Sequence, residues 1–361
     1  MWAAKQVVLI FVVAVVKILA QSAARFPSPD ATMVDAKHKE PKSGVQVGPG
    51  NTISIQSGVG TPTTINVLAF SRDSRLIAAG KDFGRVVVWD VGSRKFLSAV
   101  ETGQGIVHAV AFSADGQLLA TAGEEDQFSL KLWHLPDGKL VRRYALLNGY
   151  IRSAAFSPTG SWIVASDNAG VTHVLDSASD KQIAELKDSY SPVLSSQGDI
   201  LMTVSKEKFI VWATSDWTQK RTLPRTPIYA IPLSLSPETD RFVVTSSGAF
   251  RLLRLSTGEI LPDVPKPELP KFNGAAGGFA AFGGSGNLFG HSDDRLWVWN
   301  IKTSQTCVSD LMYSESGTLT TDGGILAGAK DNSIFAQTKS GDGVWIWDTK
   351  RLVVKCFGSA Q

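Results

Sequence analysis

Short apolar segments recur along the chain at intervals of about forty residues, and each one ends in a turn. The first three end at Phe70, Phe112 and Phe156, and Ser-Arg-Asp-Ser, Ser-Ala-Asp-Gly and Ser-Pro-Thr-Gly follow them. Weaker copies begin at Leu235 and Phe282. Ser, Pro, Asp and Gly favour turns, and small and β-branched residues come directly after them. Each copy therefore predicts two antiparallel strands joined by a tight turn.

A third apolar strand follows in each unit, and it usually has Trp at its fourth position. Seven such strands can be aligned on this Trp or on a Leu in its place. The aligned residues lie 44, 42, 37, 41, 46 and 48 residues apart, which is too even for chance. They are Trp89, Trp133, Leu175, Trp212, Leu253, Trp299 and Trp347.

A more polar fourth strand follows the third, as at residues 95–100 and 139–144. A four-stranded sheet cannot bury both of its faces alone, whereas radially stacked sheets cover one another and place the large Trp between them. The sequence therefore predicts an all-β fold, a seven-bladed β-propeller of four-stranded antiparallel blades. No segment after the first 24 residues has a helical period.

The last blade is the least clear part of the pattern. We expect its first two strands at 323–329 and 334–338, with residues 312–321 as a long connecting loop. Two segments are candidates for its outer strand, residues 52–56 and residues 352–357. We favour the N-terminal segment and leave the other open.

The Trp89-Asp90 ending of the third strand and the Phe112-Ser-Ala-Asp-Gly turn resemble WD40 repeats. The resemblance covers roughly residues 52–357 and implies a protein-interaction scaffold. The family's Gly-His before the first strand is absent, and Gln104-Gly105 stands in its place in blade two. We therefore expect the family's hydrogen-bonded network to be incomplete in each blade. The family's turn Asp before the third strand is matched by Asp82, Asp126, Asp167, Asp294 and Asp342.

The N-terminus has the layout of a secretory signal. A basic start is followed by an apolar run at residues 6–16 and by small residues that end at Ala24. We expect a signal peptide at 1–24, a flexible linker at 25–50, and the propeller at 51–361. This predicts a secreted protein in the periplasm or outside the cell. The alternative is that residues 6–24 remain as a membrane anchor of a tethered structural subunit.

The net charge of +3 includes Lys5 and Lys17, so removal of the signal lowers it by two, to +1. A nearly neutral chain without a polybasic run gives no electrostatic reason to bind nucleic acid or an anionic membrane surface. We expect a monomer that binds a protein or peptide partner and holds no cofactor and no metal ion.

The residues that could carry chemistry are scattered. None of the five histidines stands at metal-ligand spacing with another ligand, and we expect His134 and His173 to be structural. No Gly-x-Ser-x-Gly motif is present. Members of a Ser-His-Asp triad need not be adjacent in sequence, so a triad stays open. The alternative to a binding module is a propeller enzyme with its site in the central channel, either a metal-dependent lactonase-like hydrolase or a quinone-dependent oxidoreductase.

Cys307 and Cys356 fall where the outer strands of blades six and seven are expected. A disulfide needs Cα atoms within about 7 Å. Outer strands of adjacent blades diverge at the rim, so we expect two separate thiols, with a disulfide as the alternative in an exported protein.

The sharpest functional prediction concerns the mouth of the central channel. In the family that the repeats resemble, two positions of each blade often contact peptides: the residue four places before the end of the first strand and the residue before the turn Asp. We expect these residues to form a polar patch for a charged or extended segment, unless they are only a solvated rim. In blades one to three they are Asn66, Lys81, His108, Glu125, Arg152 and Ser166, and Ser191 is the first-strand position of blade four.

Overall fold

The structure is a computed structural model of the 361-residue chain. Residues 41–361 form one compact unit, and every described residue belongs to it. The expected signal peptide at 1–24 and residues 25–44 of the expected linker lie outside the described residues. The described residues are 45–48, 52–56, 65–93, 95–124, 129–145, 149–226, 229–246, 249–261, 279–283, 287–292, 295–312, 317–319, 325–330, 343–350 and 356.

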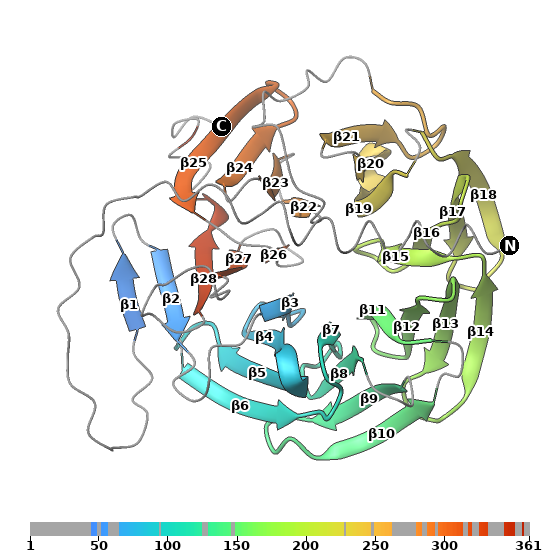
Figure 1. The fold of residues 1–361 in the computed structure, drawn as a ribbon. Helices are drawn as coiled ribbons and strands as arrows, with labels where there is room; N and C mark the ends of the chain where they lie inside the picture. The colour runs from blue at the N-terminus through green and yellow to red at the C-terminus, as the bar shows by residue number, and fades with distance from the viewer. Residues whose placement is uncertain are drawn as a thin grey trace, which may run out of the picture. The chain divides into compact units, whose positions relative to one another are not determined.

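The described part of the chain is all-β, with seven antiparallel sheets (Figure 1). Five sheets have four strands, one has three and one has five. Sheets one to three follow one another along the chain, each in the order of its strands. Sheet one contains β3 (Ile65–Phe70), β4 (Leu76–Lys81), β5 (Arg85–Asp90) and β6 (Lys95–Glu101); sheet two contains β7 (Val107–Phe112), β8 (Leu118–Gly123), β9 (Ser129–His134) and β10 (Leu140–Ala145); sheet three contains β11 (Ile151–Phe156), β12 (Trp162–Asp167), β13 (Val171–Asp176) and β14 (Gln182–Lys187).

Sheets four to six continue this order, and sheet five has three strands within the described residues. Sheet four contains β15 (Tyr190–Leu194), β16 (Ile200–Val204), β17 (Lys208–Ala213) and β18 (Gln219–Pro224); sheet five contains β19 (Ile231–Ser236), β20 (Arg241–Ser246) and β21 (Ala249–Arg254); sheet six contains β22 (Phe279–Phe282), β23 (Asn287–Ser292), β24 (Arg295–Asn300) and β25 (Gln305–Met312). All seven predicted third strands are confirmed, because β5, β9, β13, β17, β21, β24 and β28 (Gly343–Asp348) contain them.

Sheet seven joins both ends of the described chain. Strand β2 (Thr52–Gln56) pairs with β28, with Ile53 opposite Ile346, so the favoured N-terminal closing strand is confirmed. Strand β1 (Val45–Gly48) pairs with the free edge of β2 and lies inside the range expected to be a linker. Its backbone groups satisfy an edge that would otherwise be unpaired.

The expected first two strands of sheet seven were wrong. The first strand is β26 (Gly317–Leu319), in the range expected to be a loop. The segment expected to be the first strand contains β27 (Ile325–Lys330), which pairs directly with β28 and is therefore the second strand. The expected strand at 334–338 lies outside the described residues.

Neighbouring sheets bury their faces against one another. Trp133 of sheet two packs with Val86 and Val88 of sheet one, and Phe209 of sheet four packs with Phe242 of sheet five. The first strands of successive sheets contact each other from β3 to β26, and β26 contacts β3. Apolar burial between sheets is thus the main stabilisation of the fold.

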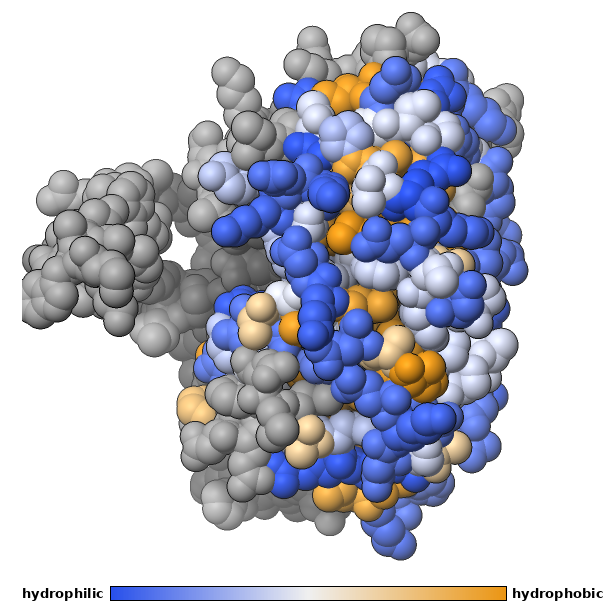
Figure 2. Space-filling model, turned by 90° about the vertical axis from the view of Figure 1, so that its right-hand side faces the viewer, coloured by the Kyte–Doolittle hydropathy of each residue, from blue (hydrophilic) through white to orange (hydrophobic). Residues whose placement is uncertain are grey.

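The fourth strands are polar, as the sequence predicted. On β14 and β18 most residues are exposed. The side of the molecule that carries these strands is largely hydrophilic, with small separate hydrophobic patches between the polar residues (Figure 2). One such exposed apolar side chain is Ile183 on β14, and isolated cases of this kind are usual on protein surfaces.

The two cysteines form a disulfide, with a Cα–Cα distance of 5.6 Å. The expectation of two separate thiols was therefore wrong. It assumed that Cys356 lies on the outer strand of sheet seven, but β2 occupies that edge of β28. Cys356 instead lies beside Cys307, and Cys307 is on β25 of sheet six.

The expectation of an incomplete hydrogen-bonded network in each blade was wrong for sheet two. The indole nitrogen of Trp133 donates to Thr121 Oγ1 at 2.8 Å, and Thr121 Oγ1 donates to Gln104 Oε1 at 2.6 Å. Gln104 is fully buried, and its amide donates to the carbonyl of Ser129 at 2.9 Å. A glutamine can both accept and donate, so it serves where the family has His.

Candidate functional site

A β-bulge lies near the start of the first strand in sheets one to five. In sheets one to three the register shifts across Asn66, His108 and Arg152, which are three of the predicted patch residues. In sheet four it shifts between Tyr190 and Val193, across the predicted Ser191. A bulge bends the strand and redirects the extra side chain. These positions therefore share a bulged backbone, although their side chains differ.

His108 and Arg152 are brought together through Tyr150. The ring centroids of His108 and Tyr150 lie 5.7 Å apart. The Arg152 guanidinium lies 4.9 Å from the Tyr150 ring centroid and donates to the Tyr150 hydroxyl at 2.5 Å. His108 Nε2 lies 3.0 Å from Glu124 Oε1. Two neighbouring sheets thus contribute one polar cluster with an aromatic centre, which suits recognition of charged groups.

The remaining predicted residues are placed differently. The Asn66 amide donates to Asp82 Oδ1 at 2.9 Å and so supports the turn of sheet one. Lys81 is 3% exposed, so it does not present its ammonium group at the surface. Glu125 lies outside the described residues. Of the six predicted patch residues, the structure thus groups His108, Arg152 and Ser166.

Ser166 lies in a cleft between sheets three and four, with a volume of about 850 Å³. Arg152 lines one wall, and Tyr190 and Ser191 of β15 line the other. Ser153 faces Ser166 across β11 and β12 in the strand register and also lines the cleft. Among the described residues, neither serine hydroxyl has a hydrogen-bond partner, although both oxygens are buried. Such an orphaned hydroxyl costs about 1–3 kcal/mol.

Sheet four holds its side of the cleft rigidly. Arg225 donates to the Tyr190 hydroxyl at 2.8 Å and to the carbonyl of Ser205 at 2.8 Å. Its guanidinium also lies 5.7 Å from the Tyr190 ring centroid. Lys206 and Asp188 contribute charges of opposite sign to the lining. A fixed aromatic wall and the orphaned serine hydroxyls make this cleft the candidate site.

The sequence did not indicate Tyr150, Ser153 or Tyr190 as site residues. Ser153 faces Ser166 only because Arg152 is bulged out of the register, and a bulge has no signature in this segment. Tyr150 and Tyr190 lie in the segments that stand where the family has Gly-His, which was the one available signal.

The histidines expected to be structural have structural contacts. His173 is buried, and its Nε2 lies 3.3 Å from Asp167 Oδ2. Asp167 also accepts hydrogen bonds from the backbone of Ala169 and Val171, as expected of the turn Asp. His134 pairs with Asp137 at 2.8 Å, and this hydrogen bond is the main cause that lowers the pKa of Asp137. Within the described ranges, no group of three or more His, Cys, Asp or Glu side chains could hold a metal ion.

Two consecutive segments match a known family model. The family is described as WD domain, G-beta repeat, and the matched residues are 96–134 and 138–176. Together they run from the last strand of sheet one to the third strand of sheet three. This chain carries WD40 repeats. Its all-β sheets are consistent with a WD40 propeller, and WD40 repeat proteins generally serve as scaffolds for protein interactions.

Several relatives that this chain matches are WD repeat proteins, and it matches only a part of each. WD repeat-containing protein 36 of Homo sapiens is 31% identical over 34% of this chain and 13% of its own length. WD repeat and SOCS box-containing protein 1 of Mus musculus is 33% identical over 26% of this chain and 22% of its own. WD repeat-containing protein 26 homolog of Drosophila melanogaster is 32% identical over 30% of this chain and 18% of its own length. This chain therefore spans less than a quarter of each of these three relatives.

Proposed function

We propose that this WD40-repeat chain is a noncatalytic interaction module that binds a protein or peptide partner in the cleft between sheets three and four. The observation that carries the proposal is the pair of buried, unpartnered hydroxyls of Ser153 and Ser166 in the wall of that cleft. A ligand that hydrogen-bonds to them removes a cost that the free protein bears.

The charges of the cleft favour an extended segment with acidic side chains. Arg152 and Lys206 are cationic. The carboxylate of Asp167 already accepts from two turn amides and His173, which leaves Asp188 as the opposing charge. Arg152 can pair with a carboxylate in two parallel hydrogen bonds while it stacks on Tyr150.

We further propose that the seven sheets close into a seven-bladed propeller. The contact of β26 with β3, and the pairing of β2 with β28, support this arrangement. The packing of Val344 of β28 in one cluster with Trp89 of sheet one supports it as well. Closure would give the cleft a rigid frame, and rigid sites lose less entropy on binding.

Export from the cytoplasm is also a proposal, and the Cys307–Cys356 disulfide supports it because disulfides persist in oxidising compartments. Mass spectrometry of the protein purified from its native cells tests this. A first residue near Arg25 is the expected result, and an intact N-terminus would mean that residues 6–24 stay attached. No membrane-spanning helix occurs in the described ranges, which begin at residue 45.

The binding proposal is tested with peptides selected on the purified protein from a displayed random library. His108→Ala/Arg152→Ala weakens the selected peptides at least about tenfold, because a charge-assisted hydrogen bond contributes about 1.5–3 kcal/mol. His134→Ala/Lys139→Ala is the matched control, since it removes two basic side chains from the exposed end of sheet two. Equal affinity for the two double variants, both folded, would refute the cleft as the site.

A further inference from the structure

A second pocket lies at the other end of the first strands, away from the cleft. It has a volume of about 300 Å³ and is lined by residues of sheets one, two, three, four and seven. Strand β11 runs from Arg152 at the cleft to Phe156 at this pocket. The pocket opens among the turns that join first and second strands, where Arg72 and Pro158 lie.

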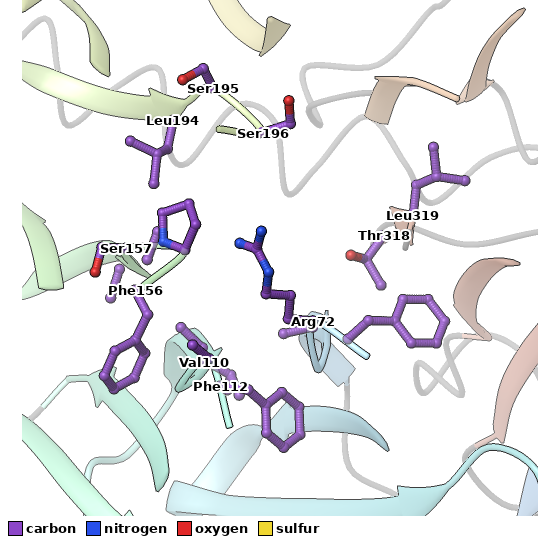
Figure 3. A pocket seen from close by; sticks show the side chains of 17 residues that line it. Arg72, Val110, Phe112, Phe156, Ser157, Leu194, Ser195, Ser196, Thr318 and Leu319 are labelled. Atoms are coloured by element: carbon purple, nitrogen blue, oxygen red, sulfur yellow. The ribbon is translucent and has the colours of Figure 1, made fainter. Parts of the chain in front are cut away.

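The walls of this pocket combine apolar side chains with the hydroxyl-bearing residues Ser157, Ser195, Ser196 and Thr318. Phe70, Phe112 and Phe156, the residues that end the first strands of sheets one to three, line it together with Leu194 and Leu319. Figure 3 shows the Arg72 guanidinium pointing into the middle of the space between these walls. Among the described residues that line the pocket, Arg72 is the one that carries a charge.

Arg72 has no partner among the described residues, in hydrogen bonds or ion pairs. The carboxylates of the neighbouring turns are engaged locally instead. Asp73 accepts from Ser71 Oγ at 2.6 Å, and Asp115 accepts from Ser113 Oγ at 2.5 Å. The Ser196 hydroxyl, on the far wall, donates to Glu238 at 3.2 Å. The described lining of the pocket therefore presents one positive charge, without an ion-pair partner, among apolar side chains and hydroxyls.

We propose that this pocket binds the C-terminal residue of a partner polypeptide, with its terminal carboxylate on Arg72 and an apolar last side chain against the apolar part of the wall, where Leu194 and Leu319 lie. A guanidinium and a carboxylate match in geometry and charge. A volume of about 300 Å³ is at the lower end of ligand pockets and suits one or two residues.

A chain end fits this pocket better than an internal acidic residue. In a C-terminal residue the carboxylate is attached directly to the carbon that bears the apolar side chain, so one residue satisfies Arg72 and the walls together. An internal Asp or Glu offers few apolar atoms and needs room for the chain on both sides. The opening among the turns lets the rest of the partner leave the pocket.

The test compares fluorescent peptides Gly-Ser-Gly-Gly-X, in which X is Leu, Phe or Val, with a free carboxylate or a C-terminal amide. The free acid of at least one peptide binds the full-length protein, and its amide binds at least tenfold more weakly. Arg72→Gln causes a similar loss and Arg72→Lys a smaller one. Arg75→Gln, in the same turn but outside the pocket lining, leaves the affinity unchanged.

Three results would overturn this proposal. The first is equal binding of the acid and the amide, and the second is no binding of any of the three acids. The third is binding of N-acetyl-leucine as tight as that of the peptides, which would indicate that the ligand is a small carboxylic acid. The comparison of acid and amide uses the unaltered protein, so it remains decisive if Arg72→Gln fails to fold. Library peptides whose affinity falls in His108→Ala/Arg152→Ala should bind Arg72→Gln with unchanged affinity. This result separates the pocket from the cleft between sheets three and four.

Discussion

Gln104 shows how one residue can take over a structural role from another type. Its side chain accepts from Thr121 and donates to two backbone carbonyls, those of Thr121 and Ser129. In this way it ties the loop before β7 to the second and third strands of sheet two. All of these groups are buried, so none of them has water as a substitute partner.

Gln104→Ala should lower the free energy of unfolding by about 2–3 kcal/mol, because it removes the acceptor of the buried Thr121 hydroxyl and two hydrogen bonds to backbone carbonyls. Gln104→His should retain most of the stability, since imidazole can also donate and accept. Urea unfolding followed by tryptophan fluorescence measures both. Gln117→Ala, at an exposed position of the same sheet, is the control. A Gln104→Ala variant as stable as the control would show that the network contributes nothing.

The Ser-x-Asp turn gives a prediction about pH. The Ser113 hydroxyl is the main cause that lowers the pKa of Asp115 below 3.8, followed by the backbone amide of Gln117. A carboxyl whose pKa is lowered by folding stabilises the protein above its unfolded pKa, and this contribution is lost as the pH falls through the folded pKa. Acid therefore weakens this turn.

Ser113→Ala should raise the pKa of Asp115 towards 3.8, because the strongest hydrogen bond to its charged form is gone. Carboxyl ¹³C NMR titration of the folded protein measures the pKa directly. Ser71→Ala, in the equivalent turn of sheet one, should leave the pKa of Asp115 unchanged. An unaltered pKa in Ser113→Ala would assign the shift to the backbone instead.

At the scale of the strands, the short strand β2 links the N-terminal region to the last sheet. It pairs with β28 on one side and β1 on the other, so five residues connect the N-terminal region to the last sheet. Without it, β28 would expose a row of unpaired backbone groups, which promotes association of chains.

A chain that begins at residue 57 should therefore be less stable and aggregate more than one that begins at residue 41. The first lacks β1 and β2, and the second keeps both. Light scattering during a thermal melt, at equal protein concentration, compares them. Identical melting and scattering would mean that β28 does not depend on this pairing.

The strands that the sequence predicted well are those with a strong local pattern. The third strands are rich in Val, Ile or Leu and have Trp or Leu at one aligned position, and all seven were predicted within one residue. Ile325–Lys330 is rich in Ala and Gly, so its place as a first or second strand depended on its pairing with β28 and not on its own pattern. The candidate site was predicted in part. The sequence places Arg152 and Ser166, whereas the facing Ser153 depends on a bulge that only the folded backbone defines.

At the scale of the whole molecule, the disulfide is the one covalent link between distant parts of the chain. It connects β25 of sheet six to a residue that follows β28 of sheet seven. The position of Cys356 could not be predicted from its own neighbours, because it depends on which chain end occupies the edge of β28.

Cys307→Ser/Cys356→Ser should lower the free energy of unfolding by up to about 4 kcal/mol, since the bond closes a loop with a sequence separation of 49 residues. Equilibrium unfolding in urea, with and without dithiothreitol, measures this. Reduced wild-type protein and either single variant should resemble the double variant, because each lacks the same bond. Insensitivity of the wild type to the reductant would argue against the bond in solution.

The pairing of β2 with β28 also sets the order in which the molecule can be completed. Sheets one to six are each made of strands that are consecutive in the chain, so their hairpins close short loops and can form as the chain is synthesised. Sheet seven needs strands from both ends and has to close the longest loop of all. Its formation must wait for the last residues to emerge, and until then the edge of β2 that pairs with β28 remains open, so that a folding helper, or a second chain, can bind it.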